Sequence, residues 1–292
     1  MVLSPAERSY IYSSLSSSEV TRTDSRKPNQ FRPLRAVCSF LPNSNGSSRI
    51  FTSDGLECIT SVKAKVTKFE SLVELVTVEV NISQQRDDSS LCLNLSSLLS
   101  KALLSSINLQ TLKLTDTYAF QLSIDIVVLS IPQDFNSSSY TLYSLLSLAS
   151  FGMFIALKST RLPLLISNTN NKDVEEEPTF ADDWESSIPL FSEDSKLNPT
   201  VLFIVSVVGN NVFIDPSLEE EQVSEHALCV GYNNGKIVAP IQSVTLSTSD
   251  GKAISVNIMK RAFELVKEIG GPVTQALTNI SKEELDDFDV AF

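Results

Sequence analysis

The stretch that most constrains this chain is residues 199–221, PTVLFIVSVVGNNVFIDPSLEEE, where an apolar run ends in a cluster of carboxylates. Val201–Val208 is an unbroken run of apolar and mostly β-branched residues. Such a run predicts a strand that is buried on both faces, and the Gly-Asn-Asn that follows predicts a tight turn. A second, short strand is predicted over residues 212–214.

Asp215 stands at the end of that short strand and is followed by Pro216. Because proline lacks the backbone N–H that a sheet ladder requires, residues 217–221 are predicted to form a loop or a bulge at the sheet edge. The prediction places four carboxylates together at this rim: Asp215, Glu219, Glu220 and Glu221. Taken alone, such a rim is a solvated acidic turn. The edge where an apolar strand meets a carboxylate cluster is also where an active site would be.

Length and charge limit the class of protein. The chain has 292 residues, of which 42% are hydrophobic and 20% are charged. A chain of this kind can bury one substantial core or two fused sub-domains. The formal net charge is −12, which argues against a free-standing nucleic-acid-binding protein because phosphate contacts need clustered Lys and Arg. Any RNA contact must therefore be local or shared with partner chains.

The cysteine and histidine content argues against metal sites and nucleophilic catalysis. The four cysteines are far apart, no Cys-x-x-Cys occurs, and His226 is the only histidine. We therefore expect buried free thiols in a reducing compartment, and no zinc site, His-based triad or cofactor. The N-terminus lacks the basic and apolar regions of a signal peptide. Residues 135–157 are uncharged, but their many polar groups favour a helix buried between sheets over a membrane span, so no membrane partner is expected.

The first half of the chain alternates strand and helix patterns. A capping box at Ser4-Pro5-Ala6-Glu7 predicts a helix over residues 5–15. The other elements expected here are strands over residues 34–41, 49–53, 57–66, 76–82 and 118–129, and helices over residues 91–105 and 139–158. The first three strands are predicted to form an antiparallel meander.

The second half repeats this plan, after an acidic connection. Residues 168–196 carry nine acidic residues against two lysines, which predicts a long surface segment. Its Trp184 is expected to pack against the body, with an interface role as the alternative. A helix over residues 255–269 is expected to stop at Gly270-Gly271-Pro272, before a final helix and an acidic tail. The expected strands are residues 201–208, 212–214, 226–231, 237–238 and 241–246.

Two groups of motifs resemble the RNase PH family of phosphorolytic 3′-to-5′ exoribonucleases. The first is the strand, Gly-Asn turn, short strand and Asp, with a second carboxylate six residues on. The second lies near the N-terminus, where residues 22–26, RTDSR, and 31–33, FRP, resemble the Arg-x-Asp-Gly-Arg opening and downstream Arg-Pro of the family. Ser25 stands where the family usually has glycine. The resemblance covers about residues 7–269.

The resemblance implies a fold and a division of the chain. The fold is α+β of the RNase PH type, similar to domain 2 of ribosomal protein S5, with two pseudo-symmetric halves that each combine a sheet with helices. The N-terminal half, including the first helix, would cover residues 1–165. Residues 166–198 would be the acidic connection, and residues 199–292 the C-terminal half.

The resemblance also implies that catalysis is lost. In active members two aspartates form the catalytic pair, and they correspond here to Asp215 and Glu221. Asp215 matches, whereas Glu221 keeps the carboxylate but reaches one methylene further. The phosphate-holding Gly-Gly-Thr-Arg loop corresponds to residues 132–136, PQDFN, which contain no arginine and no glycine pair; Asp134 would repel a phosphate. Asp215 and Glu221 are therefore expected to be a degenerate remnant, with no catalytic residue and no metal site.

The non-catalytic branch that this pattern resembles belongs to the ring of the eukaryotic exosome. The implied partners are other RNase PH-like ring subunits, RNA-binding cap proteins and a separate hydrolytic exoribonuclease, with single-stranded RNA bound through the complex. The implied roles are rRNA maturation and the turnover of mRNA and non-coding RNA, in the nucleus, nucleolus and cytoplasm.

The basic residues near the N-terminus leave two interpretations open. RNA contacts and salt bridges to carboxylates are equally compatible with Arg22, Arg26, Lys27, Arg32 and Arg35. Two rival functions also stay open, an active phosphorolytic exoribonuclease and an unrelated β-rich adaptor protein.

Overall fold

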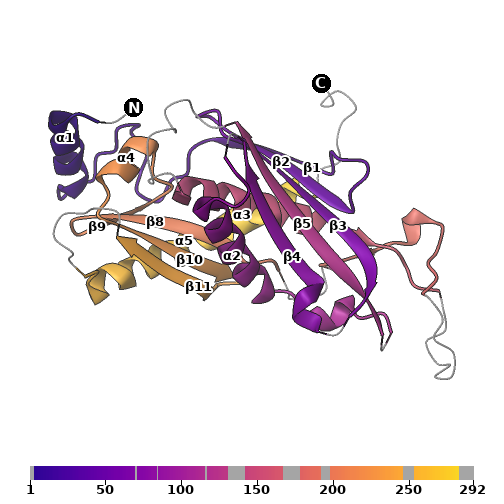
Figure 1. The fold of residues 1–292 in the computed structure, drawn as a ribbon. Coiled ribbons are helices and arrows are strands. Elements are labelled where there is room, and N and C mark those ends of the chain that lie inside the picture. Colours follow the sequence, from indigo (N-terminus) through magenta and orange to yellow (C-terminus); the bar gives the residue numbers. More distant parts are fainter. Residues whose placement is uncertain are drawn as a thin grey trace.

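The computed structural model shows two large β-sheets with helices packed between them, and a small two-stranded sheet (Figure 1). The structure describes residues 3–69, 71–83, 85–115, 117–130, 142–166, 178–191, 198–245 and 253–282. Helix α3 (Leu142–Ser159) contacts strands of both sheets, so it lies between them. The helix predicted from the uncharged segment is therefore buried between sheets, as expected. No helix among these ranges is long and apolar enough to cross a membrane.

The larger sheet has five strands in the spatial order β1-β2-β3-β5-β4. Their bounds are β1 Leu34–Cys38, β2 Gly46–Thr52, β3 Glu57–Lys68, β4 Val76–Ile82 and β5 Tyr118–Ser130. The predicted meander of β1, β2 and β3 is confirmed by antiparallel pairing. Strand β5 lies between β3 and β4 and pairs in parallel with β4. A parallel pair needs a crossover, and helix α2 (Ser90–Leu104) provides it.

The smaller sheet has four antiparallel strands in the order β11-β10-β8-β9. Their bounds are β8 Val201–Val208, β9 Asn211–Ile214, β10 His226–Asn233 and β11 Lys236–Thr245. All residues of β8 are buried, which confirms the prediction of a strand covered on both faces. A separate two-stranded sheet pairs β6 (Arg161–Leu162) with β7 (Ile188–Pro189).

The hydrophobic core is shared by the two sheets. One cluster of buried residues includes side chains from both sheets and from α3. Helix α1 (Pro5–Ser16) packs separately, with Ile11 and Leu15 against Val208 and Phe213 of the smaller sheet. The first helix, assigned from the sequence to the N-terminal half, thus contacts strands of the C-terminal half.

Helix α5 (Val256–Ile280) shows that one predicted helix end was wrong. The helix continues through Gly270, Gly271 and Pro272, and Leu277 in its last turns is buried. Gly270 is present for close packing, because a Cβ there would lie 2.5 Å from the ring of Tyr232. The glycine that suggests a helix end from sequence is therefore explained by the approach of an aromatic ring.

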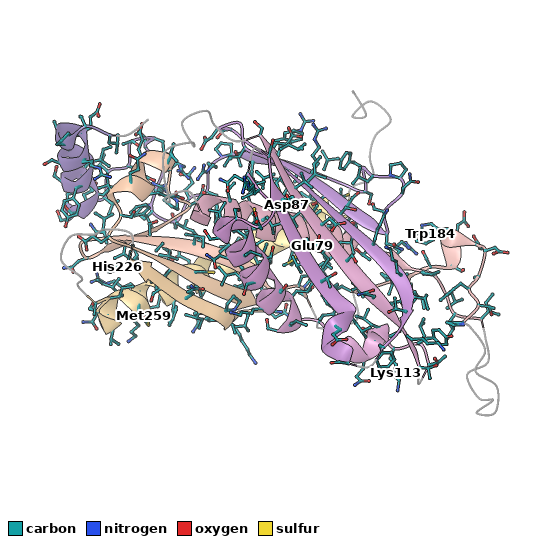
Figure 2. The ribbon with its side chains drawn as sticks, viewed as in Figure 1. Glu79, Asp87, Lys113, Trp184, His226 and Met259 are labelled. Carbon is teal, nitrogen blue, oxygen red and sulfur yellow. The ribbon has the colours of Figure 1, made fainter. Side chains whose placement is uncertain are left out.

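Trp184 does not pack against the body, so that expectation was also wrong. Its side chain is 53% exposed on a short 3-10 turn, η4 (Trp184–Ser186), at the edge of the molecule (Figure 2). Asp183 caps this turn by accepting a hydrogen bond from the Glu185 N–H at 3.0 Å.

Candidate functional site

The residues after Asp215 form a short helix, α4 (Leu218–Val223), and not the loop or bulge that Pro216 suggests. Ser217 caps it: the Glu220 N–H donates to Ser217 Oγ at 3.3 Å, and the Ser217 N–H donates to Glu220 Oε2 at 2.8 Å. This reciprocal pair is a capping box. The Ser-x-x-Glu spacing is visible in the sequence and was the signal that could have found α4.

The capped helix turns two of the expected rim carboxylates inward. Glu220 is fully buried and Glu221 is 1% exposed, while Glu219 stays exposed. Asp215 is 7% exposed. The expectation of an open rim of four carboxylates is therefore wrong, because three of the four lie in the interior. Buried carboxylates need charged or hydrogen-bonding partners, and the N-terminal segment supplies them for Asp215 and Glu220.

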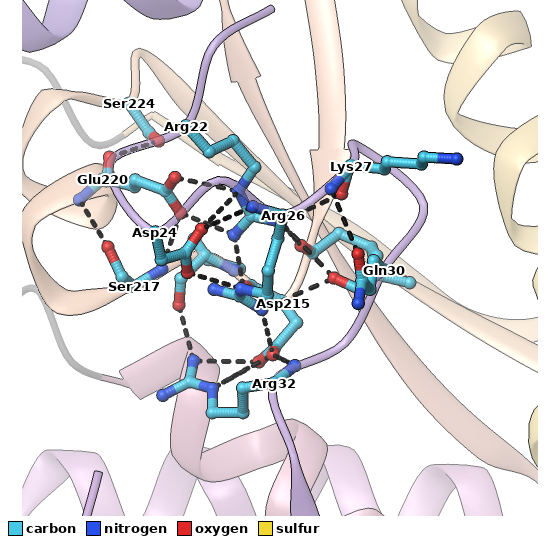
Figure 3. A network of polar contacts seen from close by, with 12 residues as sticks. Arg22, Asp24, Arg26, Lys27, Gln30, Arg32, Asp215, Ser217, Glu220 and Ser224 are labelled. Carbon is cyan, nitrogen blue, oxygen red and sulfur yellow. Dashed lines mark hydrogen bonds and ion pairs between the residues drawn. The ribbon is translucent and has the colours of Figure 1, made fainter. Parts of the chain in front are cut away.

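Glu220 pairs with Arg22, which is 198 positions earlier in the chain (Figure 3). Arg22 Nε donates to Glu220 Oε1 at 2.9 Å and Nη2 donates to Oε2 at 2.6 Å. Both side chains have no exposed surface. The guanidinium also donates to the backbone oxygens of Ile214 and Asp215, at 3.1 and 2.8 Å, and lies 5.1 Å from the centroid of the Phe213 ring. Such a two-pronged buried pair fixes both position and orientation.

The Asp215 carboxylate accepts hydrogen bonds from four N–H donors. Arg32 provides three of these donors: its backbone N at 2.8 Å, its Nη2 at 2.8 Å and its Nε at 3.0 Å. Arg26 Nη1 provides the fourth at 2.8 Å. A carboxylate has about four lone-pair positions, so the acceptor capacity of Asp215 is used. We call the set Arg22, Arg26, Arg32, Asp215 and Glu220 the arginine clasp.

The clasp changes the pKa of its charged groups. Burial alone would raise the pKa of Asp215, but the Arg32 and Arg26 guanidinium groups hold it below its ordinary value. Burial would lower the pKa of Arg32, but Asp215, Asp54 and Glu221 together raise it. Asp215 and Arg32 are therefore both charged at neutral pH.

Backbone conformation also fits the clasp. Asp215 has a φ of 49° and Ser25 has a φ of 61°, both in the left-handed region. Ser25 occupies the position where the RNase PH pattern usually has glycine, the residue for which this region is least costly. The Ile214 N–H donates to the Pro28 oxygen at 2.9 Å, which joins the N-terminal segment to the end of β9.

The clasp is unsuited to acid–base or metal chemistry. A general acid needs an exchangeable proton at a pKa near the working pH, whereas Asp215 is held ionised by two arginines. Its oxygens are occupied by N–H donors, and in the described ranges no three His, Cys, Asp or Glu side chains come together as metal ligands. Residues 132–136, predicted to replace the phosphate loop, lie outside the described residues.

The five basic residues predicted as RNA contacts divide into two groups. Arg22 and Arg32 are buried, and the Arg26 side chain is 9% exposed, all three in ion pairs with carboxylates. These three residues therefore form the salt bridges of the second interpretation. Lys27 and Arg35 are exposed. His226 is buried at the start of β10, as predicted for a strand residue.

Comparison with known proteins identifies the family. Residues 30–163 match the family described as "3′ exoribonuclease family, domain 1". Over 282 residues the chain is 41% identical to the exosome complex component RRP42 of Saccharomyces cerevisiae, covering 96% of this chain and all of that protein. The chain belongs to the RNase PH family. The exosome complex component rrp42 of Schizosaccharomyces pombe is 29% identical over 314 residues and covers 99% of each chain.

Solved structures confirm the RNase PH fold. An archaeal exosome core matches with a TM-score of 0.66 at 17% identity, covering 93% of this chain and 96% of the other. An Archaeoglobus fulgidus exosome with RNA bound to its active site matches with a TM-score of 0.66 at 16% identity, covering 93% of this chain and 97% of the other. Rice Rrp46 matches with a TM-score of 0.61 at 16% identity, covering 90% of this chain and all of the other. The predicted α+β fold is confirmed, and family membership excludes the rival of an unrelated β-rich adaptor.

Proposed function

We propose that this chain is a non-catalytic structural subunit of an RNA exosome ring. The observation that carries the proposal is its 41% identity, over 96% of this chain and all of the other, with a relative named as an exosome complex component. The strand edges of β1, β4, β9 and β11 fit the same role, since edge strands pair readily with partner chains. By this proposal its partners are other RNase PH-like subunits, RNA-binding cap proteins and a separate hydrolytic exoribonuclease.

The arginine clasp supports the absence of catalysis. Asp215, at the position of a family catalytic aspartate, is held by Arg26 and Arg32 and cannot release its oxygens without breaking the buried ion pairs with both arginines. Glu221, at the second position, is buried as well. In this chain the remnant of the active site acts as a structural link between the N-terminal segment and the second sheet.

Several finer points belong to the same proposal. RNA passes through the assembled ring, and the two exposed residues among the five predicted RNA contacts, Lys27 and Arg35, contact it. The complex works in rRNA maturation and RNA turnover, in the nucleus, nucleolus and cytoplasm. The two halves of the chain are residues 1–165 and 199–292, and the acidic connection between them is residues 166–198. The alternative function is phosphorolysis, favoured by family membership and opposed by the clasp.

Affinity purification of the tagged chain with mass spectrometry tests the proposal. We expect RNase PH-like relatives and RNA-binding proteins in near-equal amounts, and co-elution as one species on gel filtration. A chain that purifies as a stable monomer, and that binds none of these relatives on co-expression, would refute ring membership. Charge reversal at Lys27 and Arg35 should leave assembly intact and lower the slope of log affinity for RNA on log salt, by roughly 0.7 for each phosphate that is no longer neutralised.

A further inference from the structure

An apolar groove lies far from the arginine clasp, beside β5 and the β6–β7 pair. Its volume is about 320 Å³, and the side chains around it include Ile107, Leu114, Phe120, Leu162, Ile188 and Phe191. This volume lies at the lower end of the roughly 300–1,000 Å³ range of pockets that take small ligands or side chains. The groove is large enough to accept apolar side chains from another molecule.

One wall of the groove is the segment 178–191, which is fixed at both ends. The Ala181 N–H donates to the Leu164 oxygen at 2.9 Å, and the Leu190 N–H donates to the Thr160 oxygen at 3.0 Å. The Phe180 ring also packs on Phe120, with 5.5 Å between centroids. The middle of the segment therefore projects from an anchored base and can present side chains beside the groove.

Large apolar side chains are exposed around this wall. Trp184 is 53% exposed, Ile188 50%, Ile166 62% and Leu164 38%. Ile188 also lines the groove, so the exposed surface and the cavity are continuous. An apolar surface of this kind, surrounded by polar residues, is typical of a protein interaction site.

The charged side chains of the segment 178–191 all have one sign. Asp182, Asp183 and Glu185 are exposed, and none of them forms a salt bridge with a described residue. The segment itself contains no lysine or arginine. Cations lie on the neighbouring elements: Lys113, next to the groove-lining Leu114, is exposed, and Arg161 uses its Nε and Nη2 to donate to Ser187 Oγ and Ser187 O, at 2.7 and 2.9 Å.

We propose that this groove docks a segment of a partner protein in which an aliphatic or aromatic anchor lies beside two or more lysines or arginines. The anchor fills the cavity against Ile188, and the cations face Asp182 and Glu185. The acidic surface opposes RNA, whose phosphates need cations. It also opposes a second copy of this chain, which carries a net charge of −12. This inference does not depend on ring membership.

The test uses a phage-displayed library of random 12-residue peptides, selected on the purified full chain. We expect enriched peptides that combine Leu, Ile or Phe with two or more Lys or Arg. Trp184 is the only tryptophan of the chain, so a tryptophan-free synthetic copy of an enriched peptide should shift its emission to shorter wavelength on binding. The dissociation constant should rise with salt, because exposed ion pairs are screened.

Variants separate the groove from the rest of the surface. Ile188→Ser should weaken binding about tenfold because the anchor then packs against a polar side chain, and Asp182→Asn with Glu185→Gln should weaken it roughly three- to tenfold. Leu93→Ser, at a position 59% exposed on α2, is the matched control and should bind as the native chain does. The proposal is overturned if no peptide is enriched over the Ile188→Ser chain, if enriched peptides lack basic residues, or if both groove variants bind normally.

Discussion

Replacing Asp215 by Asn tests whether this carboxylate is a structural group. The Asn side chain has the same size, keeps one oxygen acceptor and tolerates the φ of 49° at this position. The substitution therefore removes the charge with little change in shape or backbone. In the native chain that charge lies between the Arg26 and Arg32 side chains, which are 9% and 8% exposed.

The size of the effect follows from burial. Removing one partner of a buried ion pair destabilises a protein by about 3–5 kcal/mol, since the other charge is left without compensation. Arg32 keeps Asp54 as a partner, so we expect the lower end, about 3 kcal/mol. Against a typical free energy of unfolding of roughly 5–15 kcal/mol, this is a large decrease.

Urea unfolding followed by circular dichroism measures the change. The matched control is Glu219→Gln, an exposed carboxylate four residues away, for which we expect a change within about 0.5 kcal/mol. A change below about 0.5 kcal/mol for Asp215→Asn, with the control also neutral, would show that the clasp does not hold this fold together.

Three further predictions concern pH, close packing and buried thiols. The pKa of Asp215 is lower in the folded chain than in the unfolded chain. The carboxylate therefore contributes its full stabilisation above its unfolded pKa, near 4, and this contribution is lost as the pH falls below that value. In acid, the urea concentration at the midpoint of unfolding should fall more steeply with pH for the native chain than for Asp215→Asn. Gly270→Ala, with its Cβ 2.5 Å from the Tyr232 ring, should cost roughly 1–3 kcal/mol in thermal unfolding, whereas Gly271→Ala should be neutral or stabilising. Burial raises the pKa of the Cys58 and Cys229 thiols to about 12, so neither should react with a disulfide reagent before unfolding.

Local patterns predicted much of the fold. Strand β8 was predicted from its apolar run and helix α1 from its capping box. Each signal lies within a few neighbouring residues, so the sequence alone shows it. The Ser217-x-x-Glu220 capping box is equally local, but the Asp215-Pro216 pair before it predicted a loop or a bulge instead of a helix. Here the capping box satisfies the backbone N–H groups of Ser217 and Glu220, and the helix forms.

The arginine clasp could not be predicted in the same way. Arg22 and Glu220 are 198 positions apart, and Arg32 and Asp215 are 183 apart. No spacing rule connects such residues, and a cluster of arginines has the same pattern whether it binds RNA or buried carboxylates. Likewise Gly270 depends on the ring of Tyr232, which comes from a different element, β10. Side-chain partners across the fold decide these roles.

The most direct test of the central claim is phosphorolysis of RNA by the purified chain, alone and in the complex with which it purifies. Labelled single-stranded RNA is incubated with inorganic phosphate and Mg²⁺, and released nucleoside diphosphates are measured for the native chain and for Asp215→Asn. We predict no phosphate-dependent release attributable to this chain, and the same result for both forms in the assembled complex. Release that requires phosphate, and that disappears with Asp215→Asn while the variant stays folded and assembled, would contradict the account.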